Sequence, residues 1–417
     1  MASSSQAAAQ LHAEAGAARL RPGSRAAYLV ASVVASRRLQ IASRCFSLIA
    51  ATGAPLRLRH ARPAAQLSVR SVGRTKYPYH EPIMRYAPPD LAVLESHDIV
   101  KTMYERRHGR QISAGKVAEV ASCFSQGSQY LAAAASAGEL VSPLLVYYGL
   151  NALARGTVLF LDPKARIATM KPAHGLGIPS WQEHLATGLD RFADLNIDID
   201  ETGTFAEFTA VTAVDRVTAF TDYKQVPLTI ASTTTMARKS RVTVKQVLSR
   251  IPDLHELYET VLEEVPNVFA VDLGYSDSGR ITLEIFGERI APDLVVLQEA
   301  IPSLATVTPE IGAPSDSRPS AKFVLEMSHQ DVRLPLRSSA GVNWLVVPLQ
   351  PSLDLSFVSI YYLLSYATGM LCRYFPQHWL ALFRGSRGDR LYPLVREGQA
   401  IVARRFQLEV ATRLFPE

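Results

Sequence analysis

An arginine and a histidine near the C-terminus are of residue types that can take part in catalysis. Arg373 and His378 lie five residues apart in an apolar segment that runs from Tyr361 to Trp379. A histidine can act as a general base, and an arginine can stabilise negative charge. Pro376 lies between them and is expected to end or kink their helix. We therefore prefer a structural interpretation, in which Arg373 makes a buried contact and His378 begins a helix.

The R-x4-H spacing nevertheless resembles that of the HEPN ribonucleases, which are four-helix bundles. The resemblance implies metal-independent cleavage of RNA, with Arg373 and His378 as catalytic residues on one helix. Tyr374 departs from the family pattern, which favours a polar residue after the arginine. A ribonuclease that takes RNA as its partner therefore remains an alternative.

A second apolar segment also carries residues capable of chemistry. It spans Ser142–Arg155 and contains Tyr147 and Asn151, and His174 follows it in a Gly/Pro-rich stretch. An imidazole among small residues can titrate near neutral pH, or it can fix its loop through a hydrogen bond. These side chains predict either satisfied polar groups of a core, which we prefer, or a small-ligand pocket lined by Tyr147, Asn151, Arg155 and His174.

Sequence motifs for other chemistries are missing from the chain. There is no P-loop, GxSxG, HExxH or zinc pattern, so we predict no cofactor and no metal site. The three cysteines, Cys45, Cys123 and Cys372, form no CxxC pair. A disulfide framework is therefore not expected, and a reducing compartment fits this cysteine usage.

Charge divides the chain into a basic leader and a mildly acidic body. Residues 1–80 hold eleven Arg, Lys76 and one acidic residue, which gives +11, whereas the whole chain carries +6 and the remaining 337 residues therefore −5. A basic nucleic-acid-binding surface on the body cannot be inferred from its total charge. No uninterrupted apolar run reaches the ~20 residues that span a bilayer, so we predict no transmembrane segment.

Hydrophobic periodicity predicts an α+β fold, with a mainly helical body and an inserted β-rich module. The parts are residues 1–80 as leader, 81–265 as helical N-terminal part, 266–348 as β-rich module and 349–417 as C-terminal helices packing on the N-terminal part. Predicted helices are Leu91–Arg107, Val117–Ala137, Ser142–Leu161 with Ser142 as N-cap, Thr243–Arg250, Ile251–Glu264, Phe357–Tyr374 and Val395–Phe415. Predicted strands are Asn196–Ile199, Val268–Leu273, Arg280–Phe286, Lys322–Met327 and Trp344–Val347, with His174–Ser180 as a loop. The two apolar motif segments are too apolar to be exposed, so we expect the helices Ser142–Leu161 and Tyr361–Tyr374 to touch.

Five motifs in order make the chain similar to the YaaC-like proteins, a bacterial family without an established activity. They are Ser142–Arg155, His174-Gly175, Gly203-x-Phe205, Val247–Leu254 with its Ile-Pro-Asp-Leu end, and Leu363–Trp379. The resemblance covers about residues 90–417. The family often has a Lys/Arg-rich run after His-Gly, whereas this chain has Leu176–Trp181, which weakens any expectation of anion binding there.

The resemblance implies a cytoplasmic bacterial protein and leaves its activity open. We favour a non-catalytic regulatory or interaction protein with an unknown protein partner or small ligand, because no complete catalytic constellation is visible. Nothing in the family resembles residues 1–80. We therefore interpret the leader as a start site placed too far upstream, or as disordered, and keep an organellar transit peptide as the alternative.

Overall fold

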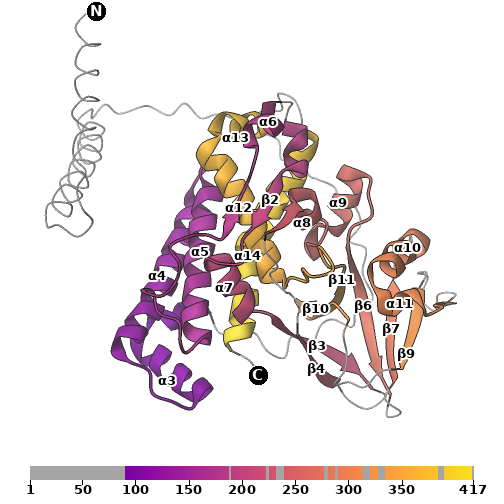
Figure 1. Cartoon of the computed structure of the whole chain (residues 1–417), viewed down its shortest axis with the longest axis horizontal. Helices are drawn as coiled ribbons and strands as arrows, with labels where there is room; N and C mark the ends of the chain where they lie inside the picture. Colours follow the sequence, from indigo (N-terminus) through magenta and orange to yellow (C-terminus); the bar gives the residue numbers. More distant parts are fainter. Residues whose placement is uncertain are drawn as a thin grey trace, which may run out of the picture. The chain divides into compact units, whose positions relative to one another are not determined.

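The chain folds as an α+β protein in which helices precede and follow a central sheet (Figure 1). A computed structural model describes residues 90–186, 189–221, 225–231, 239–276, 280–286, 290–312, 320–326, 334–383 and 389–415. These belong to one compact unit, Tyr77–Glu417. The predicted leader, 1–80, lies outside the described residues.

Four helical elements open the described part of the chain. They are η1 (Leu91–Glu95), α3 (His97–His108), α4 (Ala114–Ser136) and α5 (Ser142–Leu161). The single helix predicted over Leu91–Arg107 is wrong, because the Ser96 hydroxyl accepts from the Ile99 N–H and caps a new helix. Ser142 is not the N-cap of α5. Its hydroxyl instead donates to the Ala134 carbonyl at 3.0 Å, and Val141 precedes the helix.

A small antiparallel sheet follows, with strand order β1-β2-β5. Its strands are β1 (Leu176–Gly177), β2 (Asn196–Ile199) and β5 (Ser240–Thr243), and α6 (Trp181–Ala186), η2 (Leu189–Asp194) and α7 (Thr204–Val211) connect them. The predicted strand Asn196–Ile199 is confirmed. The predicted loop 174–180 contains β1, because Leu176 pairs with Ile199 and is buried.

Three short helices lead from this sheet to the larger one. They are α8 (Val244–Leu248), η3 (Pro252–Leu254) and α9 (His255–Leu262). The predicted cap at Thr243 is confirmed as a reciprocal capping box. Its hydroxyl accepts from Gln246 N at 3.1 Å, and Gln246 Oε1 accepts from Thr243 N at 2.8 Å.

The large sheet has the order β10-β11-β6-β7-β9-β8, and a β3–β4 hairpin joins it through one parallel pairing of β3 with β6. Its strands are β3 (Val214–Phe220), β4 (Gln225–Ala231), β6 (Val268–Tyr275), β7 (Arg280–Phe286), β8 (Glu310–Gly312), β9 (Ser320–Glu326), β10 (Leu336–Ser339) and β11 (Val342–Val346). Helices α10 (Ile290–Ala300) and α11 (Pro302–Ala305), which the sequence analysis missed, supply Leu297 and Leu304 to a second core on one sheet face. This hairpin precedes residue 266, so the β-rich part of the chain begins earlier than predicted. The side chains of β3 and β4 alternate in burial, as expected of strands with one face on a core.

The C-terminal helices complete the main core. They are α12 (Phe357–Tyr374), α13 (Pro376–Phe383), η4 (Asp389–Leu391) and α14 (Tyr392–Leu414). Helix α12 is buried from Phe357 to Cys372. The predicted contact with α5 is confirmed, and it is close: a Cβ at Gly369 would lie 2.7 Å from the Cβ of Tyr147. Glycine at this position therefore allows the two helices to approach.

Helix α5 is long and apolar enough to cross a membrane by length and composition alone. Of its most apolar window, 67% is buried inside the protein, against α4, α7, α12 and α14. Burial of this extent is expected of the central helix of a globular core, which passes the same composition test.

Candidate functional site

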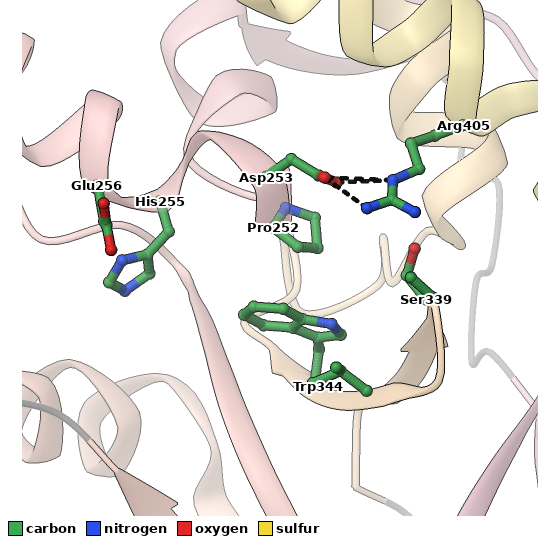
Figure 2. A pocket seen from close by; sticks show the side chains of 9 residues that line it. Pro252, Asp253, His255, Glu256, Ser339, Trp344 and Arg405 are labelled. Atoms are coloured by element: carbon green, nitrogen blue, oxygen red, sulfur yellow. Dashed lines mark hydrogen bonds and ion pairs between the residues drawn. The ribbon is translucent and has the colours of Figure 1, made fainter. Parts of the chain in front are cut away.

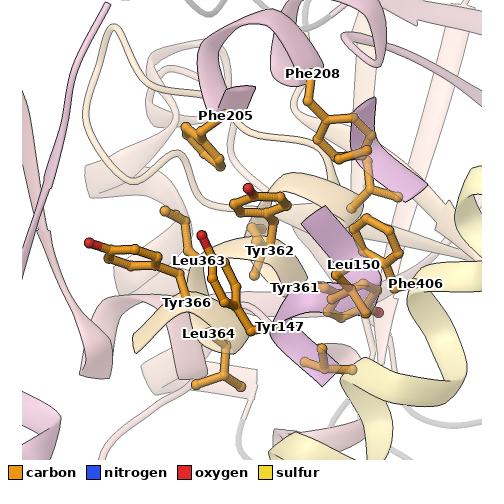
Figure 3. Close-up of a cluster of buried hydrophobic side chains, with 14 of the residues drawn as sticks. Tyr147, Leu150, Phe205, Phe208, Tyr361, Tyr362, Leu363, Leu364, Tyr366 and Phe406 are labelled. Carbon is orange, nitrogen blue, oxygen red and sulfur yellow. The ribbon is translucent and has the colours of Figure 1, made fainter. Parts of the chain in front are cut away.

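The two motif segments meet in a cluster of tyrosines, which Figure 3 shows between α5 and α12. The ring of Tyr147 packs edge-on against Tyr362 and Tyr366, with centroids 6.1 and 5.6 Å apart. Tyr147 and Tyr362 are fully buried, and Tyr366 nearly so. Aromatic pairs in this geometry add stability beyond their buried area, so the cluster holds the two helices together.

The half-buried His174 is hydrogen-bonded to this cluster. The Tyr147 hydroxyl lies 2.6 Å from His174 Nδ1. Burial raises the pKa of Tyr147 far above its ordinary value, so the phenol keeps its proton and we assign it as the donor. Burial and, secondarily, the charge of Arg373 lower the pKa of His174. The imidazole is therefore neutral at neutral pH and accepts through Nδ1.

The His174 loop is held by a second motif of the sequence, Gly203-Thr204-Phe205. The Phe205 N–H donates to the His174 carbonyl at 3.0 Å, and the Asp200 N–H donates to the Gly175 carbonyl at 2.9 Å. Gly203 has φ of 109°, and a Cβ there would lie 2.6 Å from Gly175 N. Glycine at 203 therefore lets two backbone segments pack directly, and this fixes the imidazole against Tyr147.

The hydroxyls of Tyr362 and Tyr366 have partners as well. The Tyr362 hydroxyl donates to Asn151 Oδ1 at 2.7 Å, and the Tyr366 hydroxyl donates to the Leu176 carbonyl at 2.9 Å. Burial raises the pKa of Tyr366 to about 12, so it also remains a phenol. These hydrogen bonds are the arrangement expected of polar groups in a core.

The predicted ligand-binding residues are only partly brought together. Tyr147, Asn151 and His174 belong to the tyrosine cluster through these hydrogen bonds. Arg155 is half-buried on α5, one helical turn from Asn151 and about 12 Å along the helix from Tyr147. Burial raises the pKa of Tyr362 and the charge of Arg155 lowers it, so Arg155 acts on the Tyr362–Asn151 end of the cluster, whereas the charge of Arg373 reaches His174. Ligand binding by this set stays a prediction.

The predicted catalytic pair, Arg373 and His378, is divided between two helices. Arg373 is in the last turn of α12, and α13 begins at Pro376, as expected from that proline. His378 lies near the start of α13, with its ring centroid 6.2 Å from that of Phe375. The buried contact expected for Arg373 is wrong, because its side chain is exposed and its guanidinium lies 5.0 Å from the Tyr374 ring centroid.

A pocket that the sequence analysis missed lies between η3 and α9, the β10–β11 hairpin and α14. Its volume is about 300 Å³, and Figure 2 shows its side chains. It is lined by Pro252, Asp253, His255, Glu256, Ser339, Ala340, Val342, Trp344 and Arg405. Part of the Ile-Pro-Asp-Leu motif and the two residues after it thus form a pocket wall, and residues more than 80 positions away supply the rest.

One wall of the pocket is a two-point ion pair. Arg405 donates from Nε and Nη2 to the Asp253 carboxylate, with the shortest contact 2.6 Å. The hydrogen bonds to Asp253 raise the pKa of Arg405, so the guanidinium remains charged. Because only about a fifth of each side chain is exposed, the pair gives this wall a fixed shape.

Two polar atoms of the pocket residues are buried without a hydrogen-bond partner among the described residues. They are Trp344 Nε1 and His255 Nδ1. An unsatisfied buried donor costs about 1–3 kcal/mol, so such atoms are uncommon in a folded protein. Burial lowers the pKa of His255, and its imidazole is therefore neutral at neutral pH. Both atoms are also closed to solvent, so a molecule in the open pocket does not reach them in this arrangement.

A chain of buried charges lies behind the pocket. The Ser339 hydroxyl donates to Glu409 Oε1 at 2.7 Å, and Arg413 contacts Glu409 at 3.1 Å and Asp215 at 2.5 Å. Arg337, which is fully buried, continues the chain from Asp215 at 3.2 Å to Asp354 at 2.5 Å. These contacts connect α14 with β3 and β10, so the pocket is built across the junction of the helical body and the sheet.

No group of three or more His, Cys, Asp or Glu side chains among the described residues could hold a metal ion.

The fold and these two sites define an α+β protein with a polar aromatic core and a pocket at the junction between its helices and its sheet. Its sequence matches the family described as YaaC-like Protein over residues 93–414, and the chain belongs to this family. Comparison with curated proteins and with solved structures found no match.

Proposed function

We propose that this YaaC-like protein is a non-catalytic regulatory protein that binds a small ligand in the pocket between η3, the β10–β11 hairpin and α14. The observation that carries the proposal is a pocket of about 300 Å³ whose walls come from both the helices and the sheet and include the fixed Asp253–Arg405 ion pair. This volume is at the lower end of the range of small-molecule sites.

The position of the pocket supports a regulatory role. Its walls come from the helical body and from the sheet, and Ser339 connects it to the buried charge chain through Glu409. A ligand that contacts both walls stabilises one arrangement of the two parts by its differential affinity for that arrangement.

The tyrosine cluster supports the non-catalytic part of the proposal. Tyr147 is hydrogen-bonded to His174 and Tyr362 to Asn151, and both phenols remain protonated because burial raises their pKa. A catalytic base or nucleophile needs a group that is free to exchange protons with a substrate. The motif residues therefore fit a structural role better than a reactive one.

The experiment fills the pocket with a larger side chain and measures whether the protein still retains a ligand. Wild type, Val342→Phe and Val214→Phe are each dialysed against a deproteinised cell extract, and retained compounds are identified by mass spectrometry. Val342 lines the pocket, whereas Val214 is 50% exposed at the start of β3 and is not among its lining residues. We expect wild type and Val214→Phe to retain the same compound and Val342→Phe to lose it. Equal retention by all three, or no retention by the wild type, contradicts the proposal.

A further inference from the structure

The pocket has more hydrogen-bond donors than acceptors at its α14 end. Asp253 accepts from Nε and Nη2 of Arg405, so this carboxylate is already engaged. Arg405 Nη1 makes no hydrogen bond to a described residue, and Figure 2 shows this nitrogen on the side of Ser339. A ligand that complements this end must therefore bring acceptors.

Charge at the same end is positive. Arg404 Nη2 lies 4.0 Å from Asp253 Oδ1, so two guanidinium groups share one carboxylate there. Arg404 is 61% exposed and is not itself a lining residue, but it pairs with Asp253, which is one. Glu256 lies on the far side of His255 in Figure 2, away from Arg405. The pocket is thus polarised, and an anionic group is favoured at the α14 end, where arginine pairs well with a carboxylate.

The lining of the pocket also has apolar side chains. The Trp344 indole and the Pro252 ring both line it, and Figure 2 shows the two rings between His255 and Arg405. An apolar cavity of about 150 Å³ holds a benzene molecule. A volume of about 300 Å³ therefore accommodates one or two fused rings together with a small polar group.

We propose that the ligand of this pocket is a small aromatic carboxylate, whose ring lies on Trp344 and Pro252 and whose carboxylate faces Arg404 and Arg405. The inference rests on the proposed function, since it names the chemical class of ligand for the same pocket. Hydrogen bonds from charged donors favour a carboxylate over a neutral amide of the same shape.

The test compares two probes that differ in charge. Isothermal titration calorimetry measures the binding of 1-naphthoate and of neutral 1-naphthamide to the full-length protein. We expect the carboxylate to bind about tenfold more tightly than the amide, which is the difference expected from one charge-assisted hydrogen bond.

Two arginine variants locate the charge that is responsible. Arg404→Gln removes the rim charge, and Arg396→Gln is its matched control, because both residues are on α14 and their side chains are 61% and 62% exposed. Arg396 pairs with Glu139, which lies outside the pocket lining, whereas Arg404 pairs with the lining residue Asp253. We expect Arg404→Gln to weaken naphthoate binding about threefold to tenfold. Binding by Arg396→Gln should equal that of the wild type.

Three outcomes overturn the inference. Equal affinity for the amide removes the preference for an anion, and equal weakening by both variants places binding outside the pocket. Absence of binding by either probe overturns it as well. The proposed function is judged separately by the retention experiment: a retained compound that is neutral or cationic leaves the proposed function standing and refutes the carboxylate.

Discussion

Ser339 joins the pocket to a buried acid, since its hydroxyl donates a 2.7 Å hydrogen bond to Glu409 Oε1. Ser339 is at the end of β10, and Glu409 is on α14 and only 3% exposed. The pair therefore lies where the sheet meets the helical body.

Glu409 should make the stability of the protein depend on pH. Burial raises the pKa of this carboxyl, so the folded protein holds its proton over a pH range in which the unfolded chain has lost it. The unfolding free energy then falls as pH rises above the ordinary pKa of Glu. We expect Glu409→Gln to remove this component. The unfolding free energy of the variant minus that of wild type, measured by urea denaturation, should therefore be larger at about pH 7.5 than at about pH 5, which means that the variant gains stability relative to wild type. A difference that is constant with pH, or that has the opposite slope, contradicts the prediction.

The buried Arg337 should be far more important for stability than an exposed arginine with a similar partner. Its guanidinium contacts Asp215 and Asp354 and is fully buried. Arg337→Ala leaves two buried carboxylates without this partner, which costs about 3–5 kcal/mol in a urea titration. Arg241→Ala is the control, because Arg241 pairs with Asp198 while its own side chain is 57% exposed. The control should leave the midpoint nearly unchanged, and a similar loss in both variants would refute the account of the charge chain.

Helices α5 and α12 lie too close together at Gly369 for a larger residue to fit there. A methyl group there meets the Tyr147 Cβ at 2.7 Å, so the helices must separate. We expect Gly369→Ala to destabilise the protein by about 1–3 kcal/mol. Gly138→Ala tests the same change where no atom lies within 4 Å, and its unfolding free energy should equal or slightly exceed that of wild type. Equal effects of the two substitutions would show that α5 and α12 are not in close contact.

Arg373 should affect the protonation of His174 more than the stability of the fold. The side chain of Arg373 is exposed, so Arg373→Gln should change the unfolding free energy by no more than about 0.5 kcal/mol. Its positive charge lowers the pKa of His174, and the variant should therefore show a higher His174 pKa in an NMR titration. Arg396→Gln serves again as control and should leave that pKa unchanged. A large loss of stability would contradict this prediction and would support the buried contact that the sequence analysis expected for Arg373.

Local sequence patterns predicted many elements because the cause of each element is local. The apolar run of α12, the Thr243 cap and the alternation of β7 each lie within one segment, and the structure confirms them. The break at Ser96 was missed because helical spacing continues across it. The β3–β4 hairpin was missed because it becomes part of the sheet only through its partner β6.

The pocket could not be found in the same way, because it depends on contacts between distant segments. The Ile-Pro-Asp-Leu motif marked Asp253 in the sequence, but its partner Arg405 is 152 residues further on. Trp344 is one residue of a short strand, and a strand pattern does not show that its Nε1 has no acceptor. By contrast, the tyrosine cluster was foreseeable in part, since apolar helices with polar groups must bury them against one another.

The indole NMR signal of Trp344 tests the central claim most directly. The chain has three tryptophans, so a ¹⁵N-tryptophan-labelled protein gives three indole N–H signals, and Trp344→Phe assigns the one in the pocket. Addition of 1-naphthoate should shift the Trp344 signal and leave those of Trp181 and Trp379 in place. An unchanged Trp344 signal at a naphthoate concentration that saturates binding would contradict a ligand site in this pocket.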